Sequence, residues 1–225
     1  MIGMRLMVRS VVVLLAAFGL VASSCSSDSG GSGQKGAKGD QVQLGGVVRT
    51  PPLDVATVAM PMVGSLEPMT FKADEGELLV VYFGYTSCPD ICPSTLVDIR
   101  VGLRELPDEM QKRVKVALVT VDPDRDSAVV MKGYLSTFFD EMPQIRTAAL
   151  RSDDPGELQT VADAFGVQFE VEEHALGAKQ YEVAHTAVTF VVDDRGQVVV
   201  EWPFGFTGVD MGADLKALLT NKESQ

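Results

Sequence analysis

Cysteine, histidine and net basic charge are all scarce in this chain of 225 residues. The formal net charge of −12 at pH 7 argues against a nucleic-acid-binding protein, which needs a basic surface. Beyond the N-terminal region, no apolar stretch approaches the ~20 residues of a membrane-spanning helix. Three cysteines are too few for an iron–sulfur cluster held by one chain, because such clusters take four thiolates. No internal repeat is present.

The first 24 residues have the pattern of an export signal. Arg5 and Arg9 precede the apolar run 11–22, and small residues then lead to Cys25. This pattern resembles a bacterial lipoprotein signal, in which the cysteine is lipidated and becomes the first residue after cleavage. The resemblance implies a lipid anchor with more than one acyl chain at the extracytoplasmic face of the cell membrane. A plain secretory signal with an incidental cysteine is the alternative.

The rest of the chain divides into a tether and a folded domain. Residues 25–40 begin at Cys25, are rich in glycine and serine, and are predicted to form a flexible tether. The domain is expected over 41–225 and opens with short strands and irregular edges, because prolines interrupt residues 41–72. Strands are predicted at 78–83, 114–121, 145–150, 186–192 and 197–202. Helices are predicted at 93–106, with Pro93 in the first turn, and at 128–139, 155–165 and 210–219. Strands that alternate with helices and end in a hairpin indicate an α/β fold with a mixed central sheet flanked by helices.

The two cysteines of the domain, Cys88 and Cys92, lie where the strand 78–83 runs into a helix. Residues i and i+4 share one face of a helical turn, so the two sulfurs could converge. The helix N-terminus favours the thiolate, which is both nucleophile and metal ligand, whereas Asp90 adds opposing charge. The pair could bind a soft metal ion, exchange disulfides or form a structural disulfide, although so short a loop would stabilise the fold little.

A redox-active ion on two thiolates needs a third donor, and imidazole is the usual one. His185 comes just before the predicted strand 186–192, where it could reach the end of the sheet that carries the cysteines. His174 lies in a charged loop and is expected to be an exposed loop residue. Two thiols and one imidazole suit copper, whereas structural zinc usually takes four protein ligands.

Residues 82–93 (YFGYTSCPDICP) resemble the signature of the Sco/SenC family, thioredoxin-like copper proteins that assist assembly of the dinuclear copper site of cytochrome c oxidase. Residues 119–127, 181–186 and 193–196 resemble, in the right order, its acidic loop, its histidine segment and its closing hairpin. The resemblance implies a thioredoxin-like fold with an inserted hairpin near 169–181. It also implies that Cys88, Cys92 and His185 bind one copper ion, as Cu(I) or Cu(II).

The family also suggests partners and supporting residues. The partners would be the copper-bearing subunit of cytochrome c oxidase and a copper donor protein. Asp122 and Asp126 match family positions that shape the site without binding the metal. Local sequence alone favours a different role for Asp126, as the N-cap of a helix that follows at Ser127.

Three functions remain open from the sequence. A metallochaperone, which is not an enzyme, would pass copper on by ligand exchange. A thiol–disulfide reductase would use Cys88 and Cys92 to keep the oxidase's copper-site cysteines reduced, and would not need His185. A peroxidase on the same fold would need an activated cysteine beside an arginine, and the nearest arginine in the sequence is Arg100.

Overall fold

The computed structural model describes residues 43–223. The predicted signal 1–24, the predicted lipidation site Cys25 and the predicted tether therefore lie outside the described residues. Within 43–223, no helix combines the length and the hydropathy that a membrane span requires.

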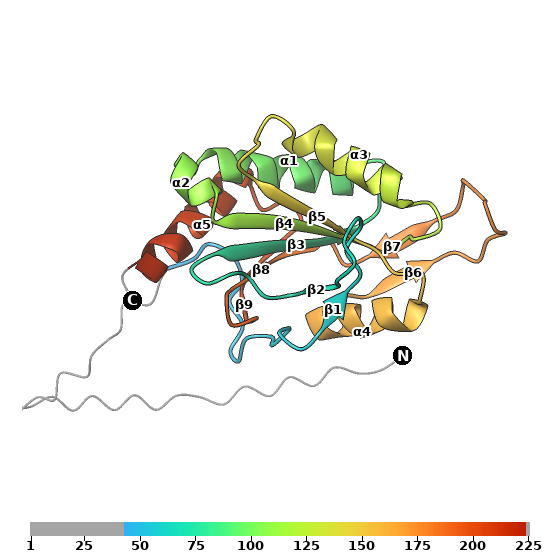
Figure 1. Ribbon diagram of the computed structural model, residues 1–225, viewed down its shortest axis with the longest axis horizontal. Helices are drawn as coiled ribbons and strands as arrows, with labels where there is room; N and C mark the ends of the chain where they lie inside the picture. The colour runs from blue at the N-terminus through green and yellow to red at the C-terminus, as the bar shows by residue number, and fades with distance from the viewer. Residues whose placement is uncertain (1–42, 224–225) are drawn as a thin grey trace, which may run out of the picture. The chain divides into compact units, whose positions relative to one another are not determined.

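A mixed sheet in the order β5-β4-β3-β8-β9 forms the centre of the fold (Figure 1). Its strands are β3 (Leu78–Gly84), β4 (Val114–Thr120), β5 (Arg146–Leu150), β8 (Val188–Val192) and β9 (Val198–Pro203). The first three run parallel to one another, β8 pairs antiparallel with β3, and β9 pairs antiparallel with β8. Every residue of β3 is buried, as expected for a central strand with both faces covered. The prediction of an α/β fold with a mixed sheet is confirmed.

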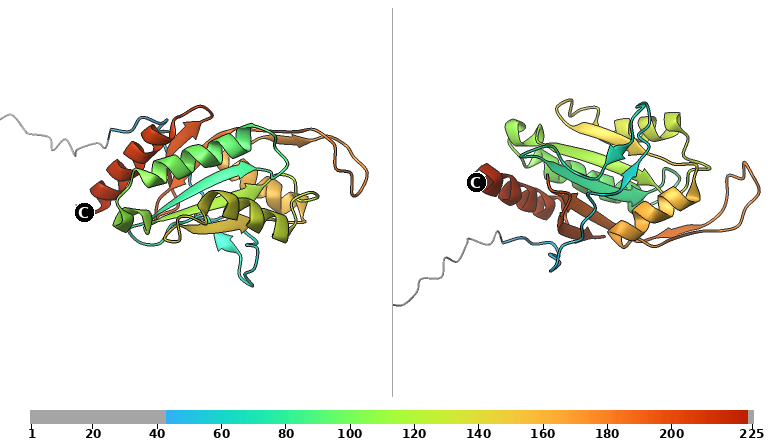
Figure 2. Two further views of the ribbon diagram at one scale, coloured as in Figure 1. Left: turned by 90° about the horizontal axis from the view of Figure 1, so that it is seen from above. Right: turned by 60° about the horizontal axis from the view of Figure 1, so that its bottom comes forward.

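Helices cover both faces of the sheet (Figure 2). Three of them, together with the short α2 (Asp108–Gln111), lie on one face: α1 (Ile91–Arg104), α3 (Ala128–Phe139) and α5 (Gly208–Glu223). On the opposite face, α4 (Pro155–Phe165) packs beside the short strand β1 (Ala59–Met60), which pairs with β2 (Met69–Thr70). The bounds of α3 and α4 agree with the predicted ones, whereas α1 begins two residues earlier than predicted.

An inserted hairpin forms a separate two-stranded sheet from β6 (Phe169–Val171) and β7 (Val183–His185). The sequence placed His185 just before a central strand, whereas in the structure it is the last residue of β7 in the hairpin. The pairing with β6 continues to Thr186, whose amide donates to the carbonyl of Gln168 (2.8 Å). The chain turns to pair with β3 only afterwards, so the central strand β8 begins at Val188.

Helices α1 and α5 approach each other closely through glycines, which gives a prediction about stability. A Cβ at Gly212 would lie 2.7 Å from the Gly102 carbonyl oxygen, a backbone atom that cannot rotate away. We expect Gly212→Ala to destabilise the fold by about 1–3 kcal/mol, as overpacking does. The matched control is Gly133→Ala in α3, where a Cβ would meet nothing within 4 Å. This variant should raise the free energy of unfolding by about 0.5–1 kcal/mol, because alanine favours a helix interior more than glycine does. Urea unfolding of both variants tests this, and equal effects would contradict the close packing.

Candidate metal centre

The first cysteine lies in the turn that joins β3 to α1. The Cys88 sulfur accepts a hydrogen bond from the backbone amide of Cys92 (3.3 Å). The residue at the N-cap position, Asp90, makes no side-chain capping bond, so the Cys88 sulfur satisfies one of the free amides at the start of the helix. Pro93 follows in the first turn, as predicted. Cys88 is partly exposed, and it and Cys92 are both free thiols.

The second cysteine is fully buried and faces the histidine. The Cys92 sulfur lies 3.5 Å from Nε2 of His185. Burial raises the pKa of Cys92 to about 12, so the cost of burying a charge outweighs the helix N-terminus that the sequence analysis invoked. Cys92 is therefore a neutral thiol at pH 7, and a bound cation would offset the cost of ionising it.

The imidazole of His185 is oriented by the backbone carbonyl of the next residue, Thr186. Nδ1 lies 3.0 Å from the carbonyl oxygen of Thr186, which only accepts, so Nδ1 carries the proton and Nε2 presents its lone pair toward Cys92. Burial lowers the pKa of His185 and keeps the ring neutral. The rings of Tyr82 and Tyr85 meet it edge-on, with centroids 6.1 and 5.9 Å away. A neutral imidazole with one free nitrogen is the form that binds metals.

The structure thus places Cys92 and His185 in direct contact, and links Cys88 to them through the Cys92 amide. No group of three His, Cys, Asp or Glu side chains among residues 43–223 is already arranged to hold a metal ion. The geometry is therefore a site of two facing donors, the Cys92 thiol and the His185 imidazole, with the Cys88 thiol nearby as a third donor.

The second histidine lies in the loop between β6 and β7, as predicted, but the expectation that it is exposed is wrong. The side chain of His174 is only 14% exposed. Its ring stacks on Tyr181 (centroids 3.6 Å apart), and its nitrogens contact the Asp124 carboxylate (3.0 Å) and the Glu172 carbonyl (2.8 Å). The local sequence around His174 gives no sign of these contacts, because Asp124 lies 50 positions earlier in the chain and Tyr181 is brought back by the hairpin.

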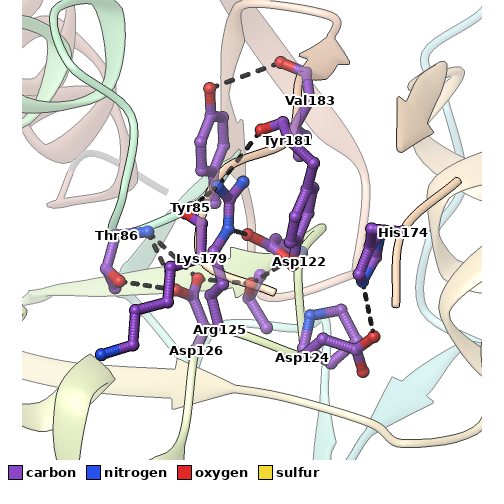
Figure 3. Close-up of polar contacts among 12 residues, drawn as sticks. Tyr85, Thr86, Asp122, Asp124, Arg125, Asp126, His174, Lys179, Tyr181 and Val183 are labelled. Carbon is purple, nitrogen blue, oxygen red and sulfur yellow. Dashed lines mark hydrogen bonds and ion pairs between the residues drawn. The ribbon is translucent and has the colours of Figure 1, made fainter. Parts of the chain in front are cut away.

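Local sequence suggested that Asp126 caps α3, and this is wrong. Its carboxylate supports the cysteine turn instead. Ser127 is the N-cap, and its side chain accepts from the Val130 amide. Asp126 is fully buried and accepts hydrogen bonds from the Thr86 amide, the Thr86 hydroxyl (2.5 Å) and the Thr120 hydroxyl (2.6 Å), as part of the network in Figure 3. Burial raises its pKa. Asp126 therefore fastens the residues before Cys88 to the end of β4.

Sequence reasoning missed two residues that shape this centre. A Cβ at Gly84 would lie 2.8 Å from the ring edge of Tyr82 and 3.1 Å from the Cys92 sulfur, so the thiol fits only beside a glycine. Tyr82 is fully buried, and its ring meets the imidazole of His185 edge-on. The one signal in the sequence was the position of Gly84, directly between the apolar strand and the cysteine turn.

Known proteins share both the sequence and the fold. The sequence matches the SCO1/SenC family over residues 65–220. A relative from Stutzerimonas stutzeri, named a putative copper-binding protein, is 29% identical over 133 residues, which cover 59% of this chain and 61% of the relative. The chain spans about 35 to 61% of the length of the curated relatives it matches.

Two solved structures with more than a quarter of their aligned residues identical have the same fold. The apo Sco1 protein from Thermus thermophilus is 28% identical, with a TM-score of 0.60 over 81% of this chain and 96% of that one. ScoI from Bradyrhizobium japonicum, solved with copper bound, is 31% identical, with a TM-score of 0.56 over 71% of this chain and 95% of that one. The chain belongs to the SCO1/SenC family and has its thioredoxin-like fold.

Proposed function

We propose that this protein is a copper metallochaperone that binds one ion through Cys88, Cys92 and His185. The observation that carries the proposal is the 3.5 Å contact between the Cys92 sulfur and the unprotonated Nε2 of His185. Thiolates are soft donors that suit Cu(I), and imidazole extends the donor set to Cu(II). The copper-bound structure of the Bradyrhizobium japonicum relative and the name of the Stutzerimonas stutzeri relative support copper as the ion.

The unequal exposure of the two thiols suits transfer of the ion. Cys88 is partly exposed in the turn before α1, so a partner's thiolate would replace this ligand first. Cys92 and His185 lie deeper and would hold the ion until the partner supplies a second donor. Three donors leave copper open to an incoming ligand, which makes stepwise exchange possible without a free ion.

A thiol–disulfide reductase is the second candidate, and the two free thiols on one turn favour it. The Cys88 thiolate would attack a partner disulfide and release one partner sulfur as a thiolate. Cys92 would then displace the second partner sulfur, so that the partner gains two electrons and Cys88–Cys92 becomes the disulfide. This sequence of steps gives no role to the imidazole of His185.

The cellular setting is also part of the proposal. The family resemblance favours the copper-bearing subunit of cytochrome c oxidase as the recipient and a separate copper donor protein. Lipidation of Cys25 would hold the domain at the extracytoplasmic face of the cell membrane. Mass spectrometry of the N-terminal peptide from membrane-derived protein tests the anchor directly.

Replacement of His185 separates the two candidate functions. We expect His185→Ala to weaken Cu(II) binding at least about 100-fold, because changes to residues that only support a ligand already cost about 10–100-fold. Reduction of a disulfide substrate should be nearly unchanged. Titration of the purified protein with Cu(II), with thiolate-to-copper absorption as readout, measures the first effect. Unchanged Cu(II) affinity would overturn the assignment of His185 as a ligand.

A further inference from the structure

The hairpin that carries His185 needs contacts outside its own sheet to fix the imidazole. Among residues 43–223, β6 and β7 pair only with each other and share no ladder with the central sheet. Along the return of the hairpin, Tyr181 is buried and Val183 and His185 are partly buried, whereas Glu182 and Ala184 are exposed. Because alternate residues of a strand face opposite sides, a small rotation or a slip of this segment would turn the imidazole away from Cys92.

One arginine bridges this segment to the loop that follows β4. Nη1 of Arg125 donates to the carbonyl oxygens of Tyr181 (3.2 Å) and Lys179 (3.4 Å). Its Nε donates to the Asp122 carboxylate (2.5 Å). The guanidinium also lies 3.7 Å over the ring of Tyr181, so it grips both the backbone and the side chain of one hairpin residue. A planar guanidinium can do both at once, and a lysine ammonium cannot.

The ion pair of Arg125 and Asp122 is buried, and the ring of Tyr181 is contacted on both faces. The side chains of Arg125 and Asp122 are 12% and 1% exposed, so solvent screens their ion pair little. Asp122 also accepts a hydrogen bond from the Tyr181 hydroxyl (2.5 Å). Figure 3 shows His174 on the other side of Tyr181, stacked on the ring and bonded to Asp124. Tyr181 is therefore clamped between Arg125 and His174.

A second contact acts two residues nearer to the imidazole. The Tyr85 hydroxyl donates a long hydrogen bond to the carbonyl oxygen of Val183 (3.4 Å). The ring of Tyr85 lies 5.5 Å from the guanidinium of Arg125 and also borders His185. The carbonyls of Tyr181 and Val183, which are alternate residues of one extended segment, are thus both fixed from outside the hairpin.

We propose that Arg125 is a positioning residue for His185, acting by fastening the return of the β6–β7 hairpin to the loop after β4. Arg125 itself does not bind the ion. The inference rests on the proposed copper site for its effect on metal binding, but the fastening of the hairpin does not depend on copper. Cu(I) can be held by the two thiolates of Cys88 and Cys92, so only Cu(II), which needs the imidazole, depends on this clamp.

The test is Arg125→Lys in the full chain. This change keeps the positive charge and removes the planar guanidinium that contacts both the carbonyls and the ring of Tyr181. We expect Cu(II) affinity to fall about tenfold, the lower end for residues that support a ligand, and Cu(I) affinity to stay within about twofold. In a His185→Ala background, the same change should have no further effect on Cu(II), because coupled residues are not additive. Arg104→Lys, at an exposed ion pair on α1, is the control and should change neither affinity.

Hydrogen exchange supplies a readout that needs no copper. In Arg125→Lys, the amides of β6 and β7 should exchange faster while those of β3 and β4 stay protected. Equal losses of Cu(I) and Cu(II) affinity, an effect that persists without His185, or unchanged exchange in the hairpin would each overturn the proposal. If the wild-type protein binds no copper, the proposed function fails. The hydrogen-exchange result still shows whether Arg125 fastens the hairpin.

A milder variant covers the case in which Arg125→Lys does not fold. Tyr181→Phe removes only the hydrogen bond to Asp122 and leaves the ring between Arg125 and His174. It should raise hydrogen exchange in β6 and β7 in the same direction, by a smaller factor. Exchange equal to that of the wild-type protein would count against the clamp.

Discussion

Replacement of Cys88 by serine is expected to abolish copper binding and leave the fold intact. The variant replaces a soft thiolate with a hydroxyl, which is a poor donor for Cu(I) and remains protonated at pH 7. We expect copper affinity to fall at least about 1,000-fold, because changes that only support a ligand already cost about 10–100-fold. The serine oxygen can still accept the Cys92 amide bond that the sulfur accepts now, since serine is a favoured helix cap. Competition with a Cu(I) chelator measures the loss.

Two companion variants separate the ligand from the cap. Cys88→Ala should lose copper and also about 1 kcal/mol of stability, because it removes the acceptor at the start of α1. Ser87→Ala changes an exposed neighbour on the same turn and should alter neither property. Copper binding by Cys88→Ser at the wild-type affinity would remove Cys88 from the ligand set.

Alkylation of the reduced protein is expected to modify Cys88 long before Cys92. With a pKa of about 12, Cys92 has a thiolate fraction near pH 7 that is about 1,000-fold below that of a thiol at the reference value of 9.0. Its complete burial slows the reaction further, whereas Cys88 is partly exposed. Iodoacetamide labelling followed by peptide mass spectrometry gives both rates, and protein unfolded in urea, where the two rates should converge, is the control.

The pH dependence of that rate has a definite sign. A thiol whose pKa is raised on folding gains thiolate as pH rises, so Cys92 labelling should accelerate about tenfold per pH unit below 12. Because the folded pKa exceeds the unfolded one, the neutral thiol favours folding below about pH 9, and this contribution is lost as pH rises toward 12. A Cys92 rate that matches Cys88 near neutral pH would show that the sulfur is neither buried nor neutral.

Most of the fold could be predicted because its elements are locally coded. The apolar run of β3 and the patterns of α3 and α4 each specify one element, and the structure has all three close to the predicted bounds. The two-residue strands β1 and β2 carry too few residues for any period to be visible, so only a region of short, irregular structure was predicted there.

The surroundings of the candidate site were harder to predict, and the failures share a cause. Asp126 was expected to make a local cap, but three donors from residues up to 40 positions away satisfy it in the interior. His174 was expected in solvent, but it stacks on a tyrosine that the hairpin brings back to it. The sequence did not predict a role for Arg125 near the site, because the carbonyls to which it donates lie 54 and 56 positions further along the chain.

Strand and helix patterns in the sequence were enough to predict the mixed α/β sheet, and the cysteine pair at a strand–helix junction was enough to predict a candidate site, because both are local patterns. The family and the third candidate ligand, His185, followed from the resemblance of residues 82–93, 119–127 and 181–186 to known motifs. Folding sets how the three candidate residues differ: Cys92 is buried and neutral, Cys88 is partly exposed just before α1, and His185 lies on a separate hairpin. These differences arise from desolvation, stacking and hydrogen bonds between segments distant in the chain, which exist only after the core has packed.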